Sequence, residues 1–175
     1  RLFILQSRTA KRAPRAAIRI AVDMASEGLI SREEALRRVT PEQLEQVLAP
    51  GFEDSPDPGD ILTKGLAVTP GVAVGKAAFT CQDAVAMARR GEKVILVRPN
   101  TSPADIAGME AAVGVVTAVG GSSSHAAIVC RDLGKVGVIG CDGVVVDTRA
   151  KRAQFGDLTV EQGEWLSLDG NSGLV

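Results

Sequence analysis

The sequence predicts an α/β domain that follows a helical N-terminal arm. Beyond residue 60, short aliphatic segments alternate with helical segments, which is typical of a sheet covered by helices. Before residue 49, amphipathic patterns and helix caps dominate, and a segment rich in Pro and Gly separates the two parts. We therefore expect three regions: residues 1–48, a hinge at 49–60, and the α/β domain at 61–175.

Composition limits the classes of function. The 175 residues, of which 45% are hydrophobic, suffice for one core and exclude a multidomain enzyme. The 20 basic and 21 acidic residues leave a net charge of -1, so charge gives no reason to expect nucleic acid or a membrane as partner. No apolar run approaches the roughly 18 residues of a membrane span. Because the chain begins with Arg1 and shows no secretory pattern, we expect a fragment of a cytoplasmic protein.

The cysteines predict neither a disulfide framework nor a zinc site. Cys81, Cys130 and Cys141 are odd in number and lack C-x-x-C spacing, and the chain has one histidine. Reduced thiols in the cytoplasm are therefore expected. No metal ligands are identifiable, so we expect no metal bound by this chain.

The N-terminal region reads as a strand followed by helices. Residues 2–7 predict a short strand that belongs to a sheet outside the chain. Pro14 opens an amphipathic helix, and Gly28 stands where its C-terminal cap belongs. Two short helices should follow. Their expected capping boxes are Ser31 with Glu34 and Thr40 with Gln43.

Three prolines and two glycines at residues 49–60 prevent a helix there and indicate the hinge. Beyond it, strands and helices should alternate. The expected strands are 71–80, 93–97, 113–119 and 136–139. The expected helices are 82–90, one that starts at Ser102 and runs through Asp105, and 124–133 before Gly134. Three further strands joined by tight turns are expected at 144–147, 158–160 and 165–168.

The only histidine lies in the most informative segment, Gly-Gly-Ser-Ser-Ser-His at 120–125, between a buried strand and a helix. Two glycines permit a sharp turn with uncovered amides, and the amides of a helix N-terminus bind phosphate. The helix dipole disfavours an imidazolium, so a neutral, nucleophilic imidazole is expected. This arrangement predicts phosphorylation of His125, with Gly120, Gly121, Ser123 and Ser124 around the phosphoryl oxygens.

Two simpler interpretations compete with this one. A lone histidine near a helix start is ordinarily a surface or capping residue, and Gly-Gly-Ser-Ser-Ser is also a plausible flexible loop. An apolar stripe favours a rigid helix beside which His125 can stay accessible. Its members are Ala126, Val129, Cys130 and Leu133. No G-x-G-x-x-G fingerprint and no G-x-x-x-x-G-K-[ST] loop occurs in the sequence.

The segment 120–131 resembles the phosphohistidine signature of the mobile domain shared by pyruvate phosphate dikinase, phosphoenolpyruvate synthase and enzyme I of the phosphotransferase system. Residues 5–8, 20–31 and 91–109 extend the resemblance to the pyruvate phosphate dikinase family over nearly the whole chain. The resemblance implies a swivelling β/β/α phosphohistidine domain with a helical linker arm.

For function, the resemblance implies a phosphotransferase domain. His125 would carry a phosphoryl group from ATP to pyruvate, and the full enzyme would release phosphoenolpyruvate, AMP and pyrophosphate. An ATP-grasp nucleotide-binding domain and a phosphoenolpyruvate/pyruvate-binding domain would be its partners. Gln6 and Arg8 match nucleotide-contacting positions of the family. Mg²⁺ would belong to the substrate domains.

Departures from the family pattern leave alternatives open. Ser122 and Ser123 stand where the family usually has Met and Thr. The Thr is phosphorylated by a regulatory kinase-phosphatase in some members, so Ser123 is a candidate regulatory site, although a structural hydroxyl at the helix cap is favoured. Arg131 could neutralise phosphate or lie on the surface. The alternatives to the pyruvate enzyme are a phosphoenolpyruvate synthase, a glucan or antibiotic phosphotransferase, or a non-catalytic docking module.

Overall fold

The structure is a computed structural model that describes residues 12–53 and 56–175. The strand expected at residues 2–7 lies outside these ranges, and so do Gln6 and Arg8. The chain divides into two compact units, Arg1–Leu48 and Ala49–Val175. Within the described ranges, no helix has the length and apolar character needed to cross a membrane.

The first unit contains the three helices that the caps predicted: α1 (Pro14–Ser26), α2 (Arg32–Arg37) and α3 (Pro41–Leu48). Ser31 accepts the amide of Glu34, and the capping box of Thr40 and Gln43 is formed in both directions. Only Ala21 is buried in these helices. Their apolar faces line an open groove.

The second unit contains nine strands, three α-helices and two 3-10 turns within the described residues. The strands are β1 (Leu66–Thr69), β2 (Val72–Ala78), β3 (Val94–Arg98), β4 (Gly114–Thr117), β5 (Val136–Ile139), β6 (Val144–Asp147), β7 (Arg152–Phe155), β8 (Leu158–Glu161) and β9 (Trp165–Asp169). The helices are α4 (Cys81–Arg89), α5 (Ile106–Ala111) and α6 (His125–Leu133), and the turns are η1 (Pro58–Asp60) and η2 (Pro103–Asp105).

Six strands form the main sheet in the order β1-β5-β4-β3-β2-β9. The four central strands are parallel, whereas β1 and β9 pair antiparallel to β5 and β2 at the two edges. Strands β3, β4 and β5 are buried almost throughout, as expected for parallel strands covered on both faces. Because these strands are parallel, the loops that follow them leave the sheet at the same edge.

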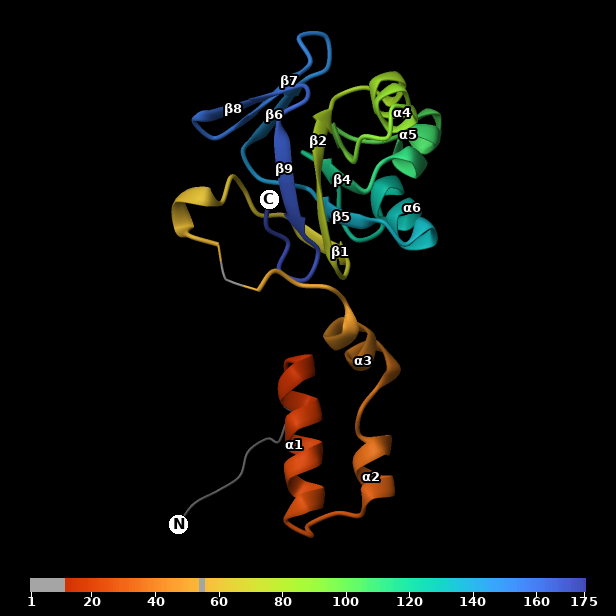
Figure 1. The fold of residues 1–175 in the computed structure, drawn as a ribbon, viewed down its shortest axis with the longest axis vertical. Helices are drawn as coiled ribbons and strands as arrows, with labels where there is room; N and C mark the ends of the chain where they lie inside the picture. Colours follow the sequence, from red (N-terminus) through yellow and green to blue (C-terminus); the bar gives the residue numbers. More distant parts are fainter. Residues whose placement is uncertain (1–11, 54–55) are drawn as a thin grey trace, which may run out of the picture. The chain divides into compact units, whose positions relative to one another are not determined.

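The main sheet lies between two other layers, which gives a β/β/α order (Figure 1). Helices α4, α5 and α6 cover one face, and their residues form an apolar cluster with the sheet that includes Met109, Cys130 and Val115. The antiparallel sheet β6-β7-β8 contributes Ala153 and Phe155 to a second cluster. The predicted α/β class, with its β/β/α layers, is confirmed.

The expected elements need several corrections. Strands β1 and β7 were not predicted, because neither Leu-Ala-Val-Thr nor Arg-Ala-Gln-Phe is distinctive in isolation and each is completed by pairing with a distant strand or hairpin. The strands expected at 71–80 and 113–119 are shorter, at 72–78 and 114–117. At the end of the first of these segments, Thr80 caps α4 instead. At the end of the second, residues 118–119 lead into the glycine turn. The helix expected from Ser102 is η2 followed by α5.

Candidate active site

Helix α6 begins at His125, one residue after the expected start at Ser124, and ends before Gly134 as the sequence predicted. Ser124 is its N-cap, and Gly134 adopts φ +62° at the C-terminal end, a conformation that glycine tolerates best. Ala126, Ala127 and Cys130 are buried against the sheet. The histidine therefore stands on a packed helix, at the end where the first amides have no carbonyl partner in their own helix.

A backbone crossing forms the turn before the histidine. Gly120 adopts φ +145°, and a Cβ there would lie 2.7 Å from Ile139 Cγ2 and 3.0 Å from Ser124 Oγ. Gly140 adopts φ +66°, and a Cβ there would collide with the Gly120 carbonyl oxygen. Gly120 is thus required by sterics. Gly121 has open space around its Cβ position and is exposed, which leaves its amide as the better candidate for a phosphate contact.

Thr117 holds this crossing together from inside. Its side chain is fully buried at the end of β4. The Thr117 hydroxyl donates to the Val119 carbonyl at 2.9 Å and accepts the Gly140 amide at 3.3 Å. The Cys141 amide donates to the Thr117 carbonyl at 2.9 Å. Hydrogen bonds therefore join the end of β4, which precedes the glycine turn, directly to the end of β5.

The imidazole of His125 is half-buried, and its Nε2 is covered by protein with no hydrogen-bond partner among the described residues. The sequence predicted an accessible ring, which is wrong for Nε2. Side chains lean toward the N-terminus of their helix, so the ring of a first helical residue is directed at the preceding turn. A buried polar atom without a partner is costly in a folded protein, so Nε2 gains a hydrogen bond or a ligand if the ring turns outward.

The three serines have different environments. The Ser124 hydroxyl accepts the Ala127 amide at 3.4 Å, so the capping hydroxyl belongs to Ser124 and not to Ser123, where the sequence interpretation favoured it. Ser122 and Ser123 are exposed. The Arg131 guanidinium donates to the Ser122 carbonyl at 2.8 Å. Arg131, placed by the sequence on the surface or near phosphate, thus reaches back across the helix to the serine turn.

The other candidates from the sequence lie elsewhere or are structural. Burial raises the pKa of the Cys130 thiol to about 11 and that of Cys141 to about 12, which fits packing residues. Gln6 and Arg8 lie outside the described residues. Within residues 12–53 and 56–175, no three His, Cys, Asp or Glu side chains group together in a way that could hold a metal ion. The nitrogen and hydroxyl groups around His125 do not suit Mg²⁺, which prefers several carboxylate or water oxygens.

Sequence reasoning missed Thr117 and Gly140 as parts of the site. A signal was present, since Thr117 is the polar end of a strand that otherwise contains only Gly and Val. Gly140 follows β5 directly and precedes a buried cysteine. Their contact with the glycine turn depends on the pairing of β4 with β5 and could not be inferred from local patterns.

Comparison with known proteins finds a family model that is similar to the part of the chain that holds this site. Residues 90–173 match the family model of the PEP-utilising enzyme, mobile domain. This range includes the strands β3, β4 and β5, the glycine turn and helix α6. Residues 90–173 are therefore similar to the mobile domain of the PEP-utilising enzymes.

The whole chain is similar to pyruvate phosphate dikinases. It is 48% identical over 176 residues to pyruvate, phosphate dikinase 2 of Oryza sativa subsp. japonica, covering 100% of the chain and 20% of the relative. It is 46% identical to pyruvate, phosphate dikinase 1, chloroplastic, of Arabidopsis thaliana, again over 100% of the chain and 18% of the relative. The chain thus spans about a fifth of the length of these relatives.

Proposed function

We propose that this chain is the phosphoryl-carrying domain of a pyruvate phosphate dikinase and that His125 is the carrier. The observation that carries the proposal is the position of the only histidine. It is the first residue of a packed helix and directly follows Gly-Gly-Ser-Ser-Ser. Free amides at this helix end favour phosphoryl oxygens. The similarity to pyruvate phosphate dikinases over the full chain supports the choice of enzyme.

In the proposed reaction, a lone pair of a His125 nitrogen attacks a phosphoryl group derived from the β-phosphate of ATP. A P–N bond forms at the β-phosphorus, the P–O bond to AMP breaks, and AMP leaves with the electron pair. An oxygen of inorganic phosphate then attacks the γ-phosphorus, pyrophosphate leaves, and the β-phosphoryl group stays on the imidazole nitrogen. In the second half, pyruvate loses a methyl proton to a base on another domain and its enolate oxygen attacks phosphorus. The P–N electron pair then returns to the imidazole. ATP, phosphate and pyruvate give AMP, pyrophosphate and phosphoenolpyruvate overall.

On this chain, binding and orientation are the tasks of the glycine–serine turn. The amide of the exposed Gly121, whose Cβ position has no atom within 4 Å, and the exposed Ser123 are the groups proposed to contact phosphoryl oxygens. Ser124 contributes by capping α6, which fixes the first turn of the helix. Because Nε2 is covered, the ring has to rotate before Nε2 can meet a phosphoryl group.

The partner domains are part of the proposal. We propose that a nucleotide-binding domain supplies the phosphoryl group, that a second domain binds pyruvate, and that Mg²⁺ is bound there. Residues 62–65 pair with residues 173–175, so these two segments of the second unit lie side by side. Their proximity supports the proposed swivelling, because a domain that is attached at one place can rotate as a body. Residues 49–60 are the proposed hinge. A regulatory kinase-phosphatase acting at Ser123 is proposed on the basis of its exposure.

The cytoplasmic location is also a proposal. The thiols of Cys81, Cys130 and Cys141 are free, which suits a reducing compartment. The Arabidopsis relative is named chloroplastic, whereas the name of the Oryza relative above carries no compartment.

Transfer of label tests the proposed function. The chain is mixed with the nucleotide-binding domain of the Oryza relative and with ATP labelled at the β-phosphate. We expect one label per chain, stable in base and labile in acid, and none in His125→Ala. Ser122→Ala, an exposed position in the same turn, is the matched control and should still be labelled. Equal labelling of His125→Ala and the wild type contradicts the carrier role, and absence of label in the wild type favours a docking module.

A further inference from the structure

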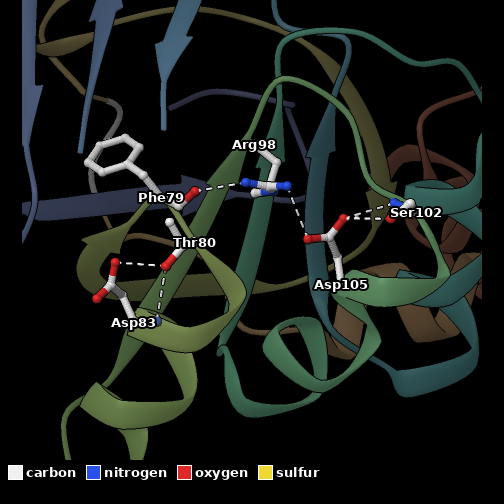
Figure 2. A network of polar contacts seen from close by, with 6 residues as sticks. All are labelled: Phe79, Thr80, Asp83, Arg98, Ser102 and Asp105. Carbon is white, nitrogen blue, oxygen red and sulfur yellow. Dashed lines mark hydrogen bonds and ion pairs between the residues drawn. The ribbon is translucent and has the colours of Figure 1, made fainter. Parts of the chain in front are cut away.

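An ion pair between a partly buried guanidinium and a buried carboxylate stands at the end of β3, beside the glycine turn. Arg98 is the last residue of this strand, and its Nη2 lies 3.2 Å from Asp105 Oδ1 (Figure 2). The two side chains are 22% and 7% exposed. A charged pair at this depth has a large desolvation cost, and apolar residues of similar size often stabilise a fold equally well. Its contacts indicate what it does.

The pair joins three segments of the chain. The second oxygen of the Asp105 carboxylate accepts the amide and the hydroxyl of Ser102, at 3.0 and 3.1 Å. Arg98 Nη1 donates to the Phe79 carbonyl at 3.0 Å, at the end of β2. Figure 2 shows the guanidinium between the Phe79 carbonyl and the carboxylate. The planar guanidinium thereby fixes the start and the end of the connection 99–105 relative to β2.

That connection supports the backbone that leads to the histidine. The Ala118 amide donates to the Arg98 carbonyl at 3.1 Å, and the Val119 amide donates to the Pro99 carbonyl at 2.9 Å. Gly120 follows immediately. Hydrogen bonds thus hold the backbone before the glycine turn on two sides. On one side it is bonded to the end of β3 and Pro99, and on the other Thr117 bonds it to Gly140 at the end of β5.

We propose that Arg98 and Asp105 are positioning residues for His125. By fixing the connection 99–105, they fix the Arg98 and Pro99 carbonyls, which accept the amides of Ala118 and Val119. Through these bonds they set the orientation of the turn at 120–124 and of the imidazole. The proposal rests on the proposed function of His125. A misplacement of about 1 Å can cost roughly 100-fold in rate, so removal of the pair should slow phosphorylation without unfolding the domain.

The chain contains a matched control. Thr80 and Asp83 cap α4 with the same kind of network: Thr80 Oγ1 donates to Asp83 Oδ2 at 2.7 Å, and Lys151 Nζ lies 2.9 Å from Asp83 Oδ1. Figure 2 shows this cap beside the first network. The hydrogen bonds and ion pair of Asp83 lead to Thr80 and Lys151, away from residues 118–125.

The test uses the fact that His125 is the only histidine. In the ¹⁵N-labelled chain, long-range proton–nitrogen spectra contain one imidazole, which reports the environment of His125 directly. Asp105→Asn keeps an oxygen for the Ser102 amide and removes the charge that pairs with Arg98. We expect shifted or broadened imidazole signals in Asp105→Asn and wild-type signals in Asp83→Asn. With labelled ATP and the nucleotide-binding domain, phosphorylation of Asp105→Asn should be about 10- to 100-fold slower.

The two kinds of failure are distinguishable. If wild-type His125 takes no label but its imidazole signals still change in Asp105→Asn alone, the positioning inference stands and the proposed function fails. If Asp105→Asn and Asp83→Asn leave the imidazole signals and the rate equally unaffected, or change both equally, the positioning inference fails. Backbone amide spectra check folding. If Asp105→Asn unfolds, the variant Arg98→Lys is used with the same imidazole signals. Lysine keeps the positive charge, but its single ammonium group cannot contact the Phe79 carbonyl and the Asp105 carboxylate in the geometry of a guanidinium.

Discussion

Gly120 and Gly140 show how single residues shape the site. Both adopt positive φ, and each would bring a Cβ into contact with the segment of the other. The carbonyl of Gly120 occupies the place where a side chain at 140 would begin. Close approach of two backbones, more than loop flexibility, therefore explains why glycine stands at these positions.

Gly140→Ala should destabilise the domain, whereas Gly121→Ala should not. At Gly140 a methyl group meets the Gly120 carbonyl at φ +66°, so we expect a loss of at least about 2 kcal/mol in the free energy of unfolding. Nothing lies within 4 Å of a Cβ at Gly121, and its loss should stay within about 0.5 kcal/mol. Urea denaturation measures both. Equal losses would contradict the crossing of the two backbones.

The cysteines should differ in reactivity. Burial raises the pKa of the Cys130 and Cys141 thiols to about 11 and about 12, so both stay protonated near pH 8, whereas Cys81 is partly exposed. Iodoacetamide at pH 8, followed by mass spectrometry, should modify Cys81 alone in the folded chain and all three cysteines in urea. Rapid modification of Cys130 in the folded chain would contradict its place in the core.

The same thiols predict a loss of stability in alkali. Because the folded state holds these protons more tightly than the unfolded state, their contribution is complete below pH 9, the ordinary thiol value, and is lost as pH rises from about 9 to about 12. Cys141→Ala should therefore show a smaller fall in the free energy of unfolding over this range than the wild type. Urea denaturation at several pH values checks this, and parallel curves would contradict it.

At the scale of elements, the ends of three parallel strands build the site. The loops after β3 and β4 are bonded to each other, and the end of β5 is bonded to β4 through Thr117. Helix α6 then begins from this junction with a serine cap. The turn is thus held by hydrogen bonds between strand ends, which explains how a segment rich in glycine and serine can have a defined conformation.

Thr117→Val tests the junction between the strands. Valine has the same shape but leaves the Val119 carbonyl and the Gly140 amide without their partner, so we expect a loss of about 1–3 kcal/mol in the free energy of unfolding. Thr69 in β1 supplies the matched control, because its buried hydroxyl has no partner among the described residues. Thr69→Val should be neutral or stabilising, measured by thermal and urea denaturation. A larger loss in Thr69→Val would contradict this account.

At the scale of the molecule, the two units differ in how much apolar surface they bury. Both apolar clusters consist of residues from 62 onward, so the second unit supplies its own core. The three helices of the first unit bury only Ala21. Short isolated helices are marginally stable in water, because most helix stability comes from packing of an apolar face.

Residues 49–175 should therefore fold on their own, and residues 1–48 should not. The excised second unit is expected to keep the amide spectrum of its core strands and a melting temperature within a few degrees of that of the whole chain. The excised first unit should show low helicity by circular dichroism. Unfolding of residues 49–175 on excision would show that the first unit contributes to its stability.

The features that the sequence could predict are those in which neighbouring residues decide the outcome. The caps at Ser31, Thr40 and Ser102, the glycine after α6 and the histidine at its start depend on contacts within a few residues. Helix bounds follow from such contacts because capping bonds and φ preferences are local. The candidate carrier was therefore found from the chain alone.

Only the tertiary structure decided which distant segments meet. The pairing of β1 and β9 with the sheet edges, the crossing of Gly120 over Gly140, and the link from Arg98 to the glycine turn join residues far apart in the sequence. Such contacts depend on strand order and register, which follow from the best burial of the whole apolar set and from no single segment.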